Sequence, residues 1–184
     1  MMLDLAGLAE DLRRITVEVT DQPDQALGSG VLWPPGYVVT NAHVVRRPRV
    51  TLQLVDGRRL TGELLARDAD ADLALIRAPG AGLPVATLGD PDAARIGSLV
   101  VAVGHPRGVR AALTAGIIHA IGPIVHGGVS WIQADLRLAP GNSGGPLADA
   151  AGRVVGLNAR VAGPLALAVP MSQVRRFVRA AGVA

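Results

Sequence analysis

The chain of 184 residues contains no cysteine and no lysine, and only four of its residues are aromatic. The lack of cysteine excludes disulfide bonds and thiolate metal sites. All 18 basic residues are arginines, and 15 acidic residues leave a net charge of only +3, which gives little support to nucleic-acid binding. Because 49% of the residues are hydrophobic but few are aromatic, we expect a folded protein whose core is filled with aliphatic side chains.

Long apolar runs are also missing from the sequence. No window reaches the length of a charge-free membrane span, so we expect no membrane-spanning segment. The first 19 residues include Asp4, Glu10 and Asp11 and lack the basic leader and continuous apolar stretch of a signal peptide. The sequence therefore predicts a cytoplasmic location for the chain as given, and an exported one if a leader was trimmed.

The hydrophobic pattern changes its period after the first residues. Leu5, Leu8 and Leu12 recur at helical spacing and predict a helix within residues 1–14. Short runs rich in β-branched and aliphatic residues follow, six of them within 15–80 and about six within 98–170, separated by turn signals. Residues 81–97, rich in proline, glycine and alanine, read as a connection, and residues 171–184 predict a second helix with Ser172 as its N-cap. These patterns predict an all-β protein of two six-stranded antiparallel units.

The hexapeptide GNSGGP, residues 141–146, contains one nucleophilic side chain, that of Ser143. Acyl transfer by a serine needs a base and backbone N–H groups that stabilise the oxyanion. Glycine at 141 allows a turn that directs the N–H groups of Gly141 and Ser143 into one hollow. Taken alone, the hexapeptide also fits a glycine-rich turn with an exposed serine.

A base for Ser143 has to come from four histidines. His43 follows an apolar run in VVTNAHVV, where a core position would hold an aliphatic residue. We interpret His105, His119 and His126 as surface or satisfied structural residues. They are dispersed and lack carboxylates at metal-ligand spacing, so no metal site is predicted.

An imidazole that acts as a base needs a carboxylate to fix its tautomer. Asp72 directly precedes the apolar run LALI, where an unpaired carboxylate would be costly. An imidazole would be a suitable partner. Asp68 and Asp70 are interpreted as solvated loop charges.

Several stretches together resemble the protease domain of the HtrA/Deg family, which belongs to the trypsin-like serine peptidases of chymotrypsin fold. They are, in order, GSGVLW, GYVVTNAHVV, DADLALIRA, LPVATLGDPDAARIGSLVVAVGHPRG, LTAGIIHAIG, IQADLRLAPGNSGGPLADAAGRVVGLN and LALAVPMSQVRRFV. The resemblance runs from about residue 12 to residue 180. It implies two six-stranded antiparallel β-barrels, in segments 15–80 and 98–170, with short terminal helices.

The resemblance also implies roles for individual residues. His43 would be the general base, Asp72 its orienting carboxylate and Ser143 the nucleophile. The oxyanion hole would be formed at Gly141, Asn142 and Ser143, and no metal or organic cofactor is needed. Asn142, in place of the aspartate of digestive members of the fold, implies that no zymogen cleavage of that kind occurs.

The same resemblance suggests where a polypeptide substrate would bind. Leu138 and Arg160 occupy positions that usually line the primary pocket. The strand expected to pair with the substrate backbone consists of Leu165, Ala166, Leu167 and Ala168. Arg160 raises two alternatives, a guanidinium that favours an acidic residue before the scissile bond or one that extends to solvent and leaves an aliphatic pocket.

The function expected from this resemblance is that of a serine endopeptidase that cleaves exposed or misfolded polypeptides in protein quality control. The alternative is a latent or weakly active module of the same fold that holds peptides as a chaperone. Three features depart from the family, and the first is the short loop DQPDQAL between the first two expected strands. No PDZ domain follows the terminal helix in this chain, and residues 1–20 lack the aromatic residues that often mediate trimer packing, so oligomerisation stays open.

Overall fold

The computed structural model describes residues 4–22, 25–80, 82–90, 94–126 and 128–183, and it contains two closed β-barrels. The remaining residues, which include residues 1–3 and parts of the 21–27 and 81–97 connections, lie outside the described ranges. The first barrel has the strand order β1-β2-β3-β6-β5-β4. Its strands are β1 (Thr16–Gln22), β2 (Gln25–Trp33), β3 (Tyr37–Thr40), β4 (Arg49–Gln53), β5 (Arg59–Asp68) and β6 (Leu73–Arg77).

The second barrel has the strand order β10-β11-β12-β9-β8-β7, and all its neighbouring pairs are antiparallel. Its strands are β7 (Leu99–Gly104), β8 (Ala112–Pro123), β9 (Ser130–Asp135), β10 (Pro146–Asp149), β11 (Val154–Ala162) and β12 (Leu165–Pro170). A 3₁₀ turn, η1 (Pro106–Gly108), connects β7 to β8. The predicted fold class, two six-stranded antiparallel barrels with two short helices, is confirmed. The domain boundaries given above stay a prediction.

Side-chain alternation explains how the strands form closed barrels. In β4, Val50 and Leu52 are buried while Arg49 and Thr51 are exposed, as expected for a strand with one face inside a barrel. In β6, residues 73–76 are all buried. Ala74 and Ile76 face the interior of the first barrel, and Leu73 and Leu75 belong to a second core between the barrels. β6 is therefore covered on both faces.

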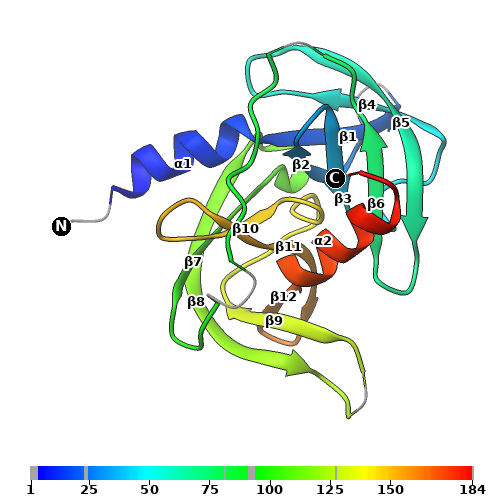
Figure 1. Ribbon diagram of the computed structural model, residues 1–184. Coiled ribbons are helices and arrows are strands. Elements are labelled where there is room, and N and C mark those ends of the chain that lie inside the picture. Colours follow the sequence, from blue (N-terminus) through cyan, green and yellow to red (C-terminus); the bar gives the residue numbers. More distant parts are fainter. Residues whose placement is uncertain (1–3, 23–24, 81, 91–93, 127, 184) are drawn as a thin grey trace.

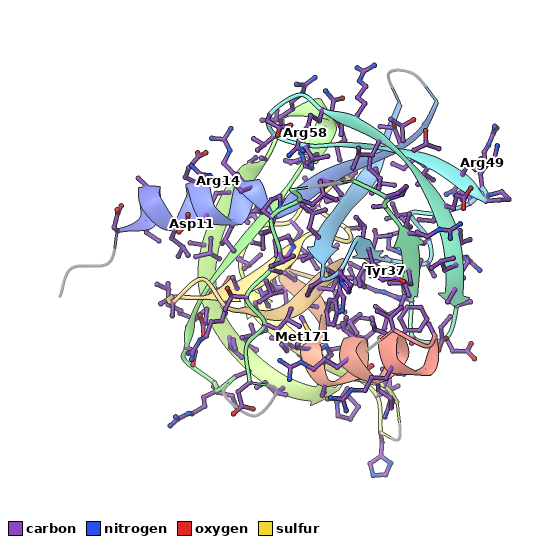
Figure 2. The ribbon with its side chains drawn as sticks, turned by 45° about the horizontal axis from the view of Figure 1, so that its top comes forward. Asp11, Arg14, Tyr37, Arg49, Arg58 and Met171 are labelled. Carbon is purple, nitrogen blue, oxygen red and sulfur yellow. The ribbon has the colours of Figure 1, made fainter. Side chains whose placement is uncertain are left out.

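The core between the barrels also receives both helices. Helix α1 (Leu5–Arg14) contributes Leu8 and Leu12, and helix α2 (Met171–Ala180) contributes Met171 and Val174. The barrels lie side by side with α2 across the region between them (Figure 1). Figure 2 shows Met171 at the start of α2, in this region. The two helices thus hold the barrels together from different sides.

The beginnings of the helices differ in how they are capped. Asp4 accepts hydrogen bonds from the N–H groups of Ala6 and Gly7, as a good N-cap does. The expectation that Ser172 caps the second helix is wrong. The helix already begins at Met171, and its N-cap is Pro170, which makes no side-chain cap. Neither helix, nor any other within the described ranges, is long and apolar enough to cross a membrane.

Candidate active site

Antiparallel pairing of β3 with β6 brings His43 and Asp72 together. Thr40 at the end of β3 is opposite Ala74 at the start of β6, and the two residues of interest lie just beyond these ends. The Nδ1 atom of His43 is 2.9 Å from each carboxylate oxygen of Asp72. The backbone N–H of His43 also donates to Oδ1 of Asp72, at 3.1 Å. The carboxylate therefore fixes both the ring and the backbone of His43.

Asp72 is held tightly at this position. Its φ of 55° is in the left-handed region, which costs free energy for a residue other than glycine. The side-chain amide of Asn41 donates to its carbonyl oxygen at 2.9 Å. Burial alone would raise the pKa of Asp72, but hydrogen bonds from His43 and Arg160 outweigh that effect and hold the pKa below its usual value. Asp72 is thus an anion at neutral pH.

Ser143 lies in the loop between β9 and β10, which hydrogen bonds tie to both barrels. The N–H of Gly144 donates to the carbonyl of Asn158 at 2.7 Å, within the second barrel. The carbonyl of Ser143 accepts from the N–H of Ser29, in β2 of the first barrel, at 2.8 Å. Gly144 has a φ of +85°, and a Cβ atom there would lie 2.0 Å from the carbonyl oxygen of Ser29. Only glycine allows this close approach between the barrels.

The hydroxyl group of Ser143 does not yet point at the imidazole. It donates to the carbonyl of Ala159, in β11, at 2.8 Å. Within the described ranges no hydrogen bond joins Ser143 to His43. Ala159 is the extra residue of a bulge in β11, between Asn158 and Arg160 in the register with β12, which explains why its carbonyl is free to accept.

The backbone around Gly141 leaves two N–H groups without an acceptor. The carbonyl of Pro140 accepts from the N–H of Arg107 at 3.0 Å, and that of Asn142 accepts from Gly145 at 3.0 Å. In a trans peptide the N–H points opposite to the carbonyl, so the N–H groups of Gly141 and Ser143 point away from those donors. No acceptor for either N–H is found in the described part of the chain. Two free donors beside a serine hydroxyl suit an oxyanion.

A buried network behind Gly141 was not foreseen from the sequence as part of the site. His105 is 2% exposed and its Nδ1 atom is 3.0 Å from the hydroxyl oxygen of Ser29. That hydroxyl donates to the carbonyl of Gly141 at 2.8 Å and accepts from the N–H of His105 at 3.0 Å. A Cβ atom at Gly141, where φ is +107°, would lie 2.1 Å from the carbonyl oxygen of His105. His105 is a satisfied structural residue, as interpreted above, and through Ser29 it supports the loop that contains Gly141.

The burial of His105 predicts a stability that depends on pH. Burial, together with the positive charge of Arg110, lowers the pKa of His105 from 6.5 to about 4. Between those values the unfolded chain binds more protons, so the free energy of unfolding should fall as the pH falls, by up to about 3 kcal/mol. Urea denaturation across this range should show a shallower pH dependence for His105→Asn. His126→Asn, at an exposed histidine, is the control and should leave the pH dependence unchanged. A pH dependence that His105→Asn does not change would contradict the assignment of this effect to His105.

The residues predicted to bind substrate are less well grouped than the predicted triad. Leu138 packs, partly buried, against the core of the second barrel. Arg160 does not extend freely to solvent. Its Nη2 atom is 3.2 Å from Oδ2 of Asp72, and its guanidinium lies 4.9 Å from the ring centroid of Trp131. The guanidinium is therefore held on the side of the cleft that contains Asp72.

The expectation that residues 165–168 pair with a substrate backbone is wrong, because residues 166–168 of β12 are paired with another strand on both sides. Leu165, Ala166, Leu167 and Ala168 pair with β11, and the last three of them also pair with β9. The free edge belongs to β11. Its partner β10 reaches only to Leu157, so the edge from Ala159 to Val161, next to Ser143, has no strand partner among the described residues.

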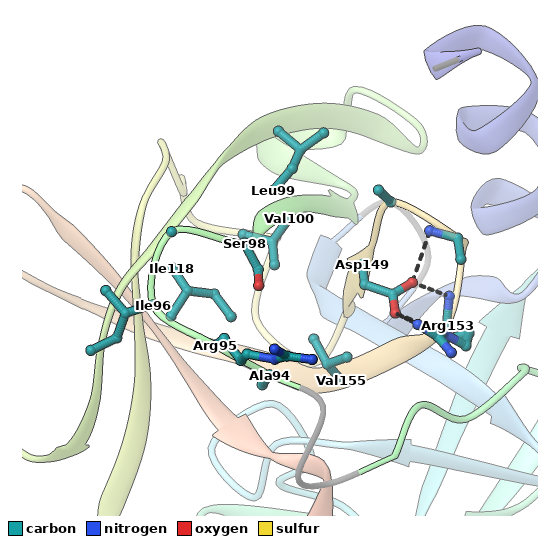
Figure 3. A pocket seen from close by; sticks show the side chains of 13 residues that line it. Ala94, Arg95, Ile96, Ser98, Leu99, Val100, Ile118, Asp149, Arg153 and Val155 are labelled. Carbon is teal, nitrogen blue, oxygen red and sulfur yellow. Dashed lines mark hydrogen bonds and ion pairs between the residues drawn. The ribbon is translucent and has the colours of Figure 1, made fainter. Parts of the chain in front are cut away.

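A different hollow, with a volume of about 580 Å³, lies beside β7 and β10. Figure 3 shows Asp149 and Arg153 bonded to each other there. The Nε atom of Arg153 donates to Asp149 at 2.8 Å, and Asp149 also accepts from backbone N–H groups. This pair therefore satisfies its own charges. The cleft at His43, Asp72 and Ser143 holds a base, a carboxylate and a nucleophile, so we take this cleft as the candidate functional site.

The profile of the trypsin-like peptidase domain matches residues 28–157, a segment that contains these three residues. The chain belongs to the trypsin-like peptidase family. Among its relatives are the probable periplasmic serine endoproteases DegP-like of Halomonas elongata, 40% identical over 141 residues, and of Pseudomonas fluorescens, 37% identical over 174 residues. These alignments cover 74% and 87% of this trypsin-like peptidase chain, but only 30% and 37% of the relatives. The chain thus spans about a third of their length.

Solved structures give the same result for the fold of this trypsin-like peptidase. The HtrA-type protease AlgW S227A with a tripeptide has a TM-score of 0.89 at 31% identity, over 96% of this chain and 63% of that one. AlgW with a decapeptide has a TM-score of 0.88 at 27% identity, over 97% of this chain and 67% of that one. The resemblance to the HtrA/Deg family stated from the sequence is confirmed.

Proposed function

We propose that the chain is a serine endopeptidase that cleaves exposed or misfolded polypeptides through an acyl-enzyme intermediate. The observation that carries this proposal is the pairing of His43 with the buried carboxylate of Asp72. The bond to Nδ1 leaves Nε2 as the basic atom of the imidazole and stabilises the imidazolium once it forms. A buried, anionic Asp72 without hydrogen-bonding partners would be costly to maintain.

In the proposed reaction the substrate lies antiparallel to the free edge of β11. The N–H of the residue whose carbonyl is attacked donates to the carbonyl of Ala159, the acceptor that the hydroxyl of Ser143 occupies in the free enzyme. Binding therefore displaces that hydroxyl, which turns to Nε2 of His43. His43 removes the proton as Ser143 attacks the substrate carbonyl.

The N–H groups of Gly141 and Ser143 then stabilise the oxyanion of the tetrahedral intermediate. His43 gives its proton to the leaving amine, and the acyl-enzyme remains on Ser143. Water, deprotonated by His43, releases the product acid and restores the serine. Apart from the substrate and the water that hydrolyses the acyl-enzyme, each step uses only side chains and backbone groups of this chain.

The proposed biological role of the chain rests on analogy with its relatives. Their names place them in the periplasm, and AlgW was solved with bound peptides. By analogy we place this chain in protein quality control in an exported setting, with polypeptides as its substrates. The alternative, a peptide-binding module of low activity, has one observation in its favour, the resting bond from Ser143 to Ala159.

Active-site labelling separates these functions. The oxygen of an activated serine attacks the phosphorus of a peptidyl phosphonate and displaces its leaving group, so we expect mass spectrometry to find one covalent adduct on Ser143. Labelling should be lost in His43→Ala, because the base is then missing. A protein that binds the same peptide reversibly but forms no adduct would support the module of low activity.

A further inference from the structure

A hollow of about 450 Å³ lies on the side of the cleft that the first barrel forms. It is lined by His43, Asp72, Arg67, Arg160 and three alanines. The small alanine side chains leave room in the hollow for a side chain of the substrate. The guanidinium groups of the two arginines are the most extended polar groups of its lining. Arg67 is not among the site residues predicted from the sequence.

The direction of a bound substrate determines which of its side chains enters this hollow. Successive side chains of an extended chain point to opposite sides. If the residue attacked by Ser143 bonds to Ala159 and directs its side chain into the second barrel, the residue before it points the other way. That direction is toward His43 and the hollow, whose lining residues include Ala159 itself.

The accessible charge in the hollow is positive. The Nε atom of Arg67 donates to the carbonyl of Ala42 at 3.1 Å, which fixes the guanidinium, and its terminal amino groups contact no acceptor among the described residues. The carboxylate of Asp72 is only 5% exposed and is occupied by His43 and Arg160. Asp68, nearby in the chain, accepts from the N–H groups of its own loop.

We propose that this hollow binds an aspartate or glutamate at the second position before the scissile bond. Arg67 makes the principal contact through its free amino groups, and the exposed part of the Arg160 guanidinium makes the second. The preference for an acidic substrate side chain thus belongs to the second position before the scissile bond and not to the wall of the primary pocket. The inference rests on the proposed endopeptidase function, because it needs the substrate direction described above.

The test uses a casein peptide with Glu, Gln or Lys at the second position before the cleaved bond; if the wild-type protein cuts no casein, the peptide is instead one that binds Ser143→Ala. We expect kcat/KM to be about tenfold higher for Glu than for Gln, and lowest for Lys. Arg67→Gln should bring the ratio of Glu to Gln close to one, and Arg160→Gln should reduce it in part. Arg59→Gln, an exposed arginine on the same strand, should leave the ratio unchanged.

Binding of the three peptides to Ser143→Ala, measured by fluorescence anisotropy, separates this inference from the proposed function. A preference for Glu in binding, lost in the double variant with Arg67→Gln, supports the subsite even if no peptide is cleaved. Cleavage with equal rates for Glu and Gln, or a ratio that Arg67→Gln does not change, would overturn the subsite and leave the endopeptidase standing. Absence of a Glu preference in both assays overturns it as well.

Discussion

Replacing Ser143 by alanine should lower kcat for casein cleavage by about 10⁶-fold, the scale seen when a serine protease loses its nucleophile. The methyl side chain cannot form an acyl-enzyme, so only stabilisation by the oxyanion N–H groups and binding remain. The fold should persist, because the hydroxyl of Ser143 makes a single bond, to the carbonyl of Ala159. Initial rates with casein, together with the melting temperature, test both statements.

Ser172→Ala is the matched control, since Ser172 is an exposed serine in the first turn of α2. It should retain the full rate. A Ser143→Ala protein that cleaves casein at a rate near that of wild type would refute the assignment of the nucleophile. Equal loss in both variants would instead indicate unfolding, which the melting temperature detects.

The sequence predicted the fold well because the information is local. Alternation in RVTLQLV, with Val50 and Leu52 inward, and the turn residues between such runs define strands without knowledge of their partners. The closure of each set of six strands came from the resemblance. Composition and periodicity alone do not tell a barrel from a sandwich.

The pairing of His43 with Asp72 is predicted from two local features of the sequence, a histidine that follows an apolar run and a carboxylate that precedes one. Both are polar residues at the ends of buried strands, which need partners. What could not be predicted was which edge of the second barrel stays open. The bulge at Ala159 and the double pairing of Leu167 depend on the tertiary register, which no short stretch of sequence contains.

Arg160 and His105 show the same limit for side chains. The guanidinium of Arg160 reaches Asp72 across the cleft between the barrels, over 88 residues of sequence separation. The ring of His105 contacts the hydroxyl group of Ser29, which lies 76 residues away in the sequence. A polar residue in a turn-like stretch such as GHPRG carries no signal that it will be buried. Only the packing of the two barrels decides that.

Asp72→Asn should lower kcat by about 10⁴-fold while changing KM much less. Both oxygens of Asp72 accept hydrogen bonds, one from the backbone N–H and Nδ1 of His43 and the other from Nδ1 and Arg160. In the Asn variant, the NH₂ group would face a hydrogen-bond donor at either of the two oxygen positions. Where it faces Nδ1, it favours the tautomer with the proton on Nε2, the atom that must accept the proton of Ser143.

The loss of negative charge acts in the same direction, because the imidazolium formed during attack is no longer stabilised. Steady-state kinetics on one peptide give kcat and KM separately, and Asp70→Asn, an exposed carboxylate two residues earlier, should match the wild type. A variant that keeps kcat but loses affinity would show that Asp72 serves only to hold Arg160 in the substrate cleft. A fall in kcat alone identifies it as the residue that orients His43.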